Sequence, residues 1–378
     1  MIGLAVNAVF NKNIGQNFRA FVQNRVLLGF TAIFFIVLVS GLWSENLDWL
    51  SNRLQMKLPF LLLPFSMVAL PRFDKGVFFP ILAGYFWVVS AVCVYSVGLY
   101  VLDFETTTEA YKQGHVLFTP VMHIRFSLIV AICVAIGWYL YQEKYYMRFP
   151  EERVMMLVVT ILLIAYLHVL AVRTGLVSLY GALGWFILHY IIKTKRYTLG
   201  IGLGVLLVLG LALAIRFVPT LWYKVNYMRW SLEQIERGER LADLSDSYRL
   251  ATIEAGIRLG NQHPILGTGW GDIKDETAAY LQNKYPELLQ VIYMPQSEYV
   301  LFYAASGLIG LLIFIWATLQ PLFYDKAWQN LFNGAFHVIM ISSFIVEQTL
   351  ETQLGVAIYV IFAVMCARFI TKGNNEKM

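Results

Sequence analysis

Charged residues are scarce in this sequence, and their scarcity excludes an ordinary soluble domain. Only 14% of the 378 residues are Asp, Glu, Lys or Arg, whereas a soluble domain carries about a quarter. Hydrophobic residues make up 58%, and the mean hydropathy is +0.61. Because a soluble core does not absorb apolar runs this long, part of the surroundings must be lipid.

Cysteine is also rare, and the placing of the three cysteines argues against a disulfide framework or a cysteine metal site. Cys93, Cys133 and Cys366 each lie in an apolar run, where a thiol is a small buried hydrophobe. No cleavable signal peptide is visible, since the first long apolar run, from Val26, would act as an uncleaved anchor. The net charge of +5 reflects membrane topology and does not indicate nucleic-acid binding.

Apolar runs predict an all-α polytopic membrane fold with about ten transmembrane helices, because each run is long enough to cross roughly 30 Å of hydrocarbon. The runs are 26–43, 57–71, 77–102, 124–141, 153–172, 174–192, 198–217, 297–320, 330–348 and 353–371. The second run is short and starts at Lys57-Leu58-Pro59. The fifth and sixth are almost continuous, which predicts a tight hairpin at Arg173.

Lys and Arg residues on alternate connections form one set, which the positive-inside rule places in the cytoplasm. The long segment 218–296 then lies outside, where its length indicates a functional loop. The expected regions are an N-terminal transmembrane bundle (1–217), a large extracytoplasmic loop (218–296), a C-terminal transmembrane bundle (297–371) and a cytoplasmic tail (372–378).

Most of the distinctive polar residues fall on the outer side. They are Arg53, Lys57, His123, Arg125, Arg173, Arg249, Gln296, Glu298, Glu347 and Glu351. Ionisable residues at membrane depth are costly and usually face a cavity or a partner. The cluster therefore predicts an outward-facing polar site at the lipid boundary.

The outer loop is predicted to contain helices and a glycine-rich turn. Asp246-Ser247 is expected to cap a helix that Gly260-Asn261 and Pro264 end. The following G-x-G-x-G turn, within 263–272, lacks the dinucleotide-binding spacing. Its glycines either supply positive φ angles or direct backbone amides at a phosphate.

Four features occur in a fixed order. They are Val172-Arg173-Thr174-Gly175 at a helix start; Ser247-Tyr248-Arg249 followed by His263-Pro264-Ile265-Leu266-Gly267-Thr268-Gly269; Pro295-Gln296-Ser297-Glu298-Tyr299 with Ser306-Gly307-Leu308-Ile309-Gly310 after it; and a long outer loop between late spans. Together, over residues 26–371, they resemble the O-antigen ligase and polymerase family of polytopic glycosyltransferases. The resemblance implies a GT-C-like fold in the bacterial inner membrane, with an active site facing the periplasm.

The resemblance also implies the reaction, which is transfer of a glycan from undecaprenyl diphosphate to an acceptor such as lipid A-core, in lipopolysaccharide biosynthesis. It implies a metal-independent and inverting enzyme that needs no cofactor. Arginines are suited to stabilising a diphosphate leaving group. Arg173 and Arg249 are the expected catalytic cations, with His123 and Arg125 also binding the lipid carrier.

The sequence departs from the family where the motif usually begins with His-Asn, since Gln296-Ser297 stands there, and Gln is no base. The expected catalytic set therefore includes Gln296 and, as the nearest carboxylate, Glu298. Glu347 and Glu351 are expected to share or support this role. Structural alternatives remain: Arg173 snorkelling from its hairpin, Arg249 pairing with Asp246 or Glu254, and Glu298 favoured only by the helix dipole.

Other functions also remain open. A polymerase would add the glycan to a growing lipid-linked chain, and a protein O-oligosaccharyltransferase would add it to Ser or Thr. A polyprenyl-linked sugar transporter is the alternative from another class, but it would show internal repeats and polar residues at the midplane. The sequence shows no such repeat. A structural membrane subunit would not need so many outward charges.

Overall fold

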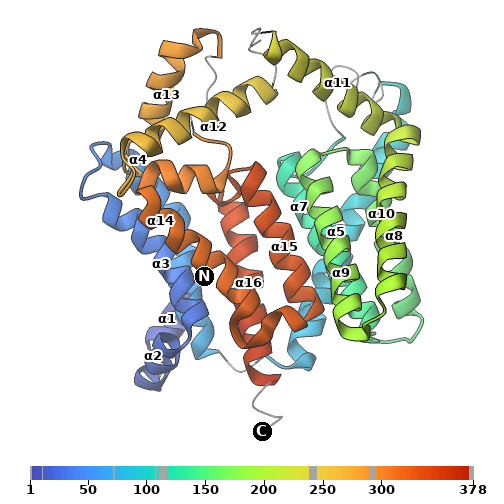
Figure 1. Cartoon of the computed structure of the whole chain (residues 1–378). Helices are drawn as coiled ribbons and strands as arrows, with labels where there is room; N and C mark the ends of the chain where they lie inside the picture. The colour runs from blue at the N-terminus through green and yellow to red at the C-terminus, as the bar shows by residue number, and fades with distance from the viewer. Residues whose placement is uncertain are drawn as a thin grey trace. The chain divides into compact units, whose positions relative to one another are not determined.

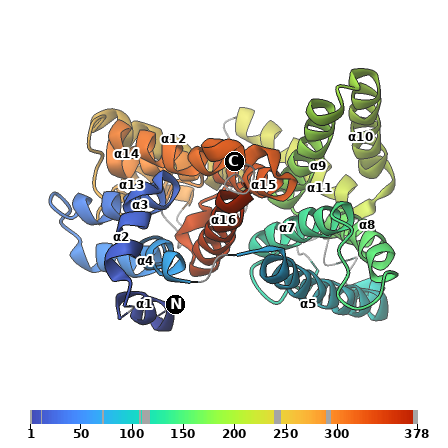
Figure 2. The same cartoon turned by 90° about the horizontal axis from the view of Figure 1, so that it is seen from below.

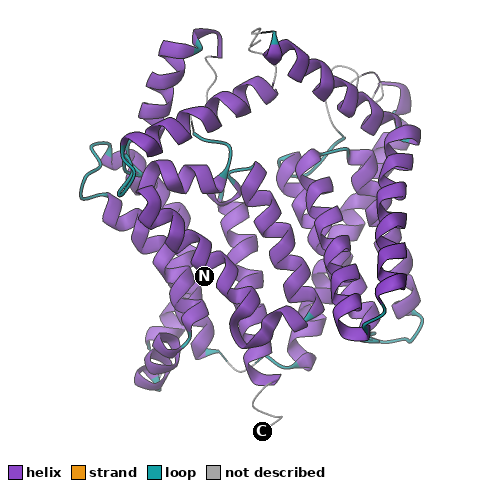
Figure 3. Ribbon diagram, viewed as in Figure 1, coloured by secondary structure: helices purple, strands orange, loops and turns teal. Residues whose placement is uncertain are grey.

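A computed structural model describes residues 2–10, 12–70, 73–106, 109, 117–237, 245–288 and 294–373. Helices account for most of these residues, and no strand occurs among them (Figure 3). The predicted all-α fold is confirmed. Residues 374–378 of the predicted cytoplasmic tail lie outside the described residues.

Seven helices of the described chain are long and apolar enough to cross a membrane. They are α5 (Lys75–Leu102), α7 (His123–Gln142), α8 (Glu152–Leu170), α9 (Arg173–Thr194), α10 (Tyr197–Phe217), α14 (Glu298–Phe323) and α16 (Gln353–Gly373). The bent pair α2 (Ile14–Gln23) and α3 (Arg25–Ser40), at 87°, adds an eighth if it forms one span. The polytopic membrane fold is thus confirmed, and the count of ten spans stays a prediction.

The two remaining expected spans are also helical, but neither is among the seven helices that are long and apolar enough to cross a membrane. Helix α15 (Leu331–Val346) is apolar but has only 16 residues. Helix α4 (Leu47–Ala69) begins ten residues before the predicted run 57–71 and continues through Pro59 and Pro64. Lys57 therefore lies inside a helix and does not mark its start.

By their contacts, the helices form two compact units. The first unit contains residues 1–72, 229–327 and 344–378, and the second contains 73–228 and 328–343. These units are defined by packing, whereas the four predicted regions are defined by membrane topology. The predicted region boundaries therefore stay a prediction.

In the first unit, α3 packs against α4 and α14, and α16 packs against α4. Helix α12 (Ser245–Gln262) lies along α14 and carries α13 (Ile273–Lys284), as Figure 1 shows. Phe30 and Phe344 meet the buried Tyr359 ring edge-on, with centroids 5.7 and 5.3 Å away. The unit also contains α1 (Ile2–Val9), η1 (Pro286–Leu288) and η3 (Thr349–Glu351). It contains η2 (Tyr324–Gln329) except for the last two residues, which belong to the second unit.

In the second unit, α7 is the central helix and packs against α5, α8 and α9 (Figure 2). Glycines permit this close packing, since a Cβ on Gly175 of α9 would lie 2.4 Å from the Cβ of Ser127 on α7. Helix α10 packs against α9, and Gly200 is its one buried residue. Helix α11 (Pro219–Glu236) follows α10.

Candidate active site

A buried cluster of charges lies in the first unit between α4 and the η3 turn. Arg53 and Lys57 are one helical turn apart on α4, so their side chains leave the same face. Arg53 Nη1 donates to Glu351 Oε2 at 3.1 Å, and Lys57 Nζ donates to Glu351 Oε1 and, at 3.0 Å, to the Leu350 carbonyl. The Lys57 side chain is fully buried. Burial would raise the pKa of Glu351, but Lys57 and Arg53 hold it below its usual value.

Glu298, the first residue of α14, completes this cluster. Its Oε2 accepts the Leu350 amide at 2.9 Å, and its Oε1 lies 3.8 Å from Lys57 Nζ. Two buried cations thus face two buried carboxylates, so the cluster is formally neutral. In this arrangement Glu298 fixes the turn between α15 and α16 against the start of α14.

Arg249 forms a second, more accessible group in the same unit. Its Nη2 donates to Glu347 Oε1, and its Nε donates to Gln296 Oε1 at 3.3 Å. The Arg249 side chain is 22% exposed, whereas that of Glu347 is only 6% exposed. Arg249 therefore pairs with Glu347, just after α15, and not with Asp246 or Glu254 of its own helix. Two partners orient a guanidinium that still reaches the surface.

The structure explains the glycine-rich turn. Gly267 and Gly269 have φ angles of +72° and +100°, which side-chain-bearing residues rarely adopt. The amides of Thr268 and Gly269 donate to the carbonyls of Ala304 and Ala305 at 2.9 and 3.0 Å. These amides already have partners within the protein, so the turn is structural and does not present them to a phosphate.

The turn docks where α14 is broken. Gly307 has φ 63° and ψ −164°, and the Leu308 amide donates to the Pro264 carbonyl at 2.8 Å, outside its own helix. The loop thus replaces the hydrogen bonds that α14 gives up at the break. A Cβ on Gly307 would lie 2.3 Å from the Ile265 backbone, so only glycine fits.

Trp270 links this turn to the buried charges. Its fully buried indole donates from Nε1 to Ser306 Oγ at 2.6 Å and meets Phe302 edge-on at 5.0 Å. Lys57 Nζ lies 5.2 Å from the Trp270 ring centroid, within reach of a cation–π interaction. The glycine turn therefore supplies an aromatic wall to the Lys57 site.

One carboxylate on α12, that of Glu254, connects this helix to α13 and to the residue after it. Glu254 accepts hydrogen bonds from Lys284, from Tyr280 at 2.9 Å and from Tyr285 at 2.8 Å. Burial would raise the pKa of Glu254, but these bonds, with Lys284 first, lower it to about 2. Helix α12 begins at Ser245. Asp246 and Ser247, which the sequence predicted as its cap, therefore lie in its first turn.

The other three predicted site residues belong to the second unit. Arg125 is buried in the first turn of α7 and Arg173 is half-buried at the start of α9. Because Ser127 packs on Gly175, the two arginines lie at the same end of two adjacent helices. His123, the first residue of α7, is half-buried at this end. Ala171, at φ 51°, makes the tight break predicted before Arg173.

A polar pocket of about 670 Å³ lies beside α13 in the first unit. It is lined by Trp43, Glu45, Asn46, His263, Gly267, Thr268, Asp272, Asp275 and Glu276. Its lining has four carboxylates and no Lys or Arg, so it repels a diphosphate. In the described part of the chain, no group of three or more His, Cys, Asp or Glu residues is placed to hold a metal ion.

Sequence reasoning counted Arg53 and Lys57 among the outer polar residues but gave neither a role, and it did not single out Trp270. A lysine inside an apolar run was the available signal for Lys57, with Arg53 four residues earlier. The first unit brings five predicted residues into two neighbouring groups linked through 296–298 and 347–351: Arg249, Gln296, Glu298, Glu347 and Glu351.

Comparison with known protein families finds a match over the middle of the chain. Residues 156–315 match the family described as O-antigen ligase. The match begins in α8 and includes Arg173, Arg249 and the Gln296–Glu298 entry to α14. No curated protein matches the chain. The all-α, multi-pass membrane fold agrees with this match, which supports the resemblance of the chain to the O-antigen ligase/polymerase family of membrane glycosyltransferases over residues 156–315.

Proposed function

We propose that this protein is an O-antigen ligase that transfers a glycan from undecaprenyl diphosphate to lipid A-core on the periplasmic side of the inner membrane. The observation that carries the proposal is Arg249, a partly exposed guanidinium oriented by Gln296 and Glu347 at the entry to α14. A fixed, permanently charged fork is suited to a diphosphate.

The proposed reaction needs no metal and inverts the anomeric centre. The acceptor oxygen attacks the anomeric carbon while the bond to the diphosphate oxygen breaks, and undecaprenyl diphosphate leaves with that electron pair. Arg249 stabilises the charge that develops on the diphosphate. In the second unit, Arg173 and Arg125, at one end of α9 and α7, are proposed to contribute to binding of the lipid carrier, with His123 at the same end.

The proton of the acceptor hydroxyl needs a base, for which we propose Glu347. It is the carboxylate in contact with Arg249, so it would lie next to the leaving group. Gln296, at the position of the family histidine, orients Arg249 and is not a base. Glu298 and Glu351 are assigned to positioning, because each is buried and bonded to the turn or to α4.

The acidic pocket beside α13 is proposed to bind the acceptor. Its carboxylates offer hydrogen-bond acceptors to hydroxyl groups, and Trp43 offers an apolar face. Its negative lining excludes the diphosphate, which separates an acceptor site from a donor site.

The test uses the purified protein in detergent with an undecaprenyl-diphosphate-linked oligosaccharide and lipid A-core. We expect a mass increase of the core band with the wild-type protein. Arg249→Ala should lower kcat by about 10²–10³-fold, the usual cost of one oxyanion-stabilising donor. Arg249→Lys should be intermediate, since the charge remains but the fork is lost. Arg258→Ala, an exposed arginine on the same helix, is the matched control and should be unaffected.

Other outcomes would replace the proposal. Lengthening of the carrier-linked glycan without core would show a polymerase, and transfer to Ser or Thr of a protein would show a protein O-oligosaccharyltransferase. If the donor binds but is transferred to none of the three acceptors, the enzyme assignment fails and a polyprenyl-linked sugar transporter takes its place.

A further inference from the structure

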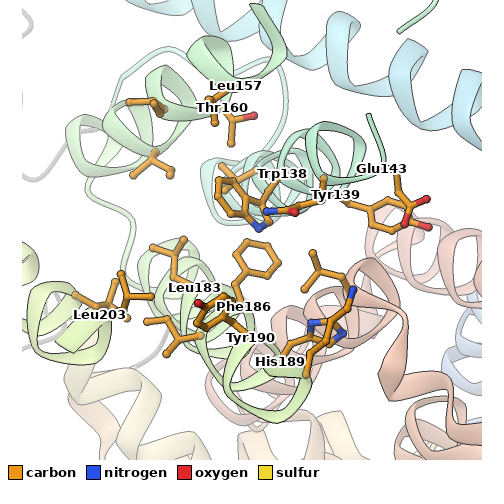
Figure 4. A pocket seen from close by; sticks show the side chains of 18 of the residues that line it. Trp138, Tyr139, Glu143, Leu157, Thr160, Leu183, Phe186, His189, Tyr190 and Leu203 are labelled. Atoms are coloured by element: carbon orange, nitrogen blue, oxygen red, sulfur yellow. The ribbon is translucent and has the colours of Figure 1, made fainter. Parts of the chain in front are cut away.

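An apolar groove of about 860 Å³ lies in the second unit. It is lined by residues of α7, α8, α9 and α10 and by Gln329, Asn330 and Leu331. Figure 4 shows Trp138 and Phe186 close together in it, with Leu203 and Leu157 further out. The Trp138 and Phe186 rings stack with centroids 6.1 Å apart. None of the residues assigned to the candidate active site lines this groove.

The length of the groove is about the thickness of one leaflet of a bilayer. Along α9 its lining runs from Leu183 to Lys193, and the rise between these two residues is about 15 Å of helix. This length is half of the roughly 30 Å hydrocarbon core. On α10 the lining runs from Leu199 to Leu207, which is about 12 Å. A single lipid chain entering from one face has this reach.

The polar lining residues gather at one end of the groove. They lie where α7 and α9 end and where α15 begins, and include Gln142, Glu143, His189, Lys193 and Asn330. The connection after α9 adds Lys195 and Arg196, with no acidic residue in 193–196. Glu143 is already paired with Lys75 at 2.7 Å, so cations dominate this mouth. By the positive-inside rule this is the cytoplasmic end.

The surroundings determine what fills an apolar groove at this depth. Helix α10 is almost entirely exposed apart from its contact with α9, so it faces lipid. No water is present in the hydrocarbon core to fill the space, and an apolar cavity takes apolar ligands. A chain attached to an anionic headgroup matches both the apolar walls and the cationic mouth.

We propose that this groove is a binding site for an anionic glycerophospholipid of the cytoplasmic leaflet, with one acyl chain along α7 and its phosphate at Lys193. The bound lipid fills the space between α8 and the α9–α10 pair and so holds α10 to its unit. The proposal does not depend on the reaction at the active site.

The test is native mass spectrometry of the whole protein, delipidated in detergent and titrated with phosphatidylglycerol. One phosphatidylglycerol should be retained per chain. Leu203→Trp fills the groove and should weaken retention by about tenfold or more. Val205→Trp, on the same helix but not in the lining, should retain lipid like the wild type. Ile161→Trp, on the α8 wall, is a second filling variant in case Leu203→Trp does not fold.

The headgroup is tested separately. Lys193→Glu should weaken phosphatidylglycerol retention by about fivefold, the effect of one cation near an anionic lipid, and should leave phosphatidylethanolamine retention unchanged. Equal retention by the filling variants and the wild type would overturn the site. Preferential retention of undecaprenyl phosphate or phosphatidylethanolamine over phosphatidylglycerol would overturn the proposed occupant.

Discussion

Glu351 balances two buried cations, so its charge controls the stability of the first unit. Replacing Glu351 by Gln removes one partner of a buried pair and leaves Lys57 and Arg53 under-compensated. We expect a loss of about 3–5 kcal/mol in the free energy of unfolding, measured by denaturant unfolding in detergent. Lys75→Met breaks an exposed pair, with a lysine side chain that is 67% exposed, and should cost no more than about 1 kcal/mol.

A double replacement distinguishes charge from packing. Lys57→Met with Glu351→Leu removes one cation and one anion together, leaving Arg53 and Glu298. Because an uncompensated charge is avoided, the double variant should be markedly more stable than Glu351→Gln. Equal losses in both variants would show that the cluster acts through packing instead.

The same residue predicts a pH dependence. The pKa of Glu351 in the folded protein lies below its ordinary value of 4.5. Its contribution to stability is therefore complete above about pH 4.5 and is lost as the pH falls through the lower, folded-state pKa. Unfolding followed from pH 7 to pH 3 should show a gap between wild type and Glu351→Gln that closes on the acidic side. A gap that widens on acidification would contradict the assignment.

At this scale the sequence pointed to several polar residues but not to the pairs that they form. Arg249, Gln296 and Glu347 were expected at a site, yet their mutual contacts join residues 47 and 98 positions apart. Lys57 and Glu351 are 294 positions apart. Contacts of this range depend on how helices pack, which residue spacing alone does not determine.

Among the elements, the break in α14 and the glycine turn form one interlocked feature. Gly307→Ala would force a side chain into a left-handed conformation and into the Ile265 backbone. We expect a loss of about 1–3 kcal/mol or more from backbone strain, with loss of transfer activity because Trp270 and Lys57 shift. Gly204→Ala is the matched control: nothing lies within 4 Å of its added Cβ, so it should be neutral or slightly stabilising.

Helix positions were predicted well where the apolar run had clear ends. The run 198–217 corresponds to α10 (Tyr197–Phe217) and the run 124–141 to α7. The prediction failed at α4, because Lys57-Leu58-Pro59 resembles a helix start while the preceding residues, 47–56, are polar enough to resemble a loop. Asn46, whose side chain accepts the Trp49 amide at 3.0 Å, is the actual cap.

For the whole molecule, the expected orientation gives a labelling prediction. Glu276→Cys on α13 should react with a membrane-impermeant maleimide in spheroplasts, because the loop is expected outside. Lys195→Cys should react only after permeabilisation. The native cysteines are buried, so wild-type protein supplies a low background. The reverse pattern would invert the topology and place the candidate site on the cytoplasmic side.

The interlock between the glycine turn and α14 also has a consequence for biosynthesis. The carbonyls of Ala304 and Ala305 receive their hydrogen bonds from Thr268 and Gly269, which the ribosome makes about 36 residues earlier. A carbonyl without a partner costs several kcal/mol in hydrocarbon. Stable insertion of α14 therefore depends on the glycine turn having folded against it, which couples membrane insertion of this span to folding of the loop that precedes it.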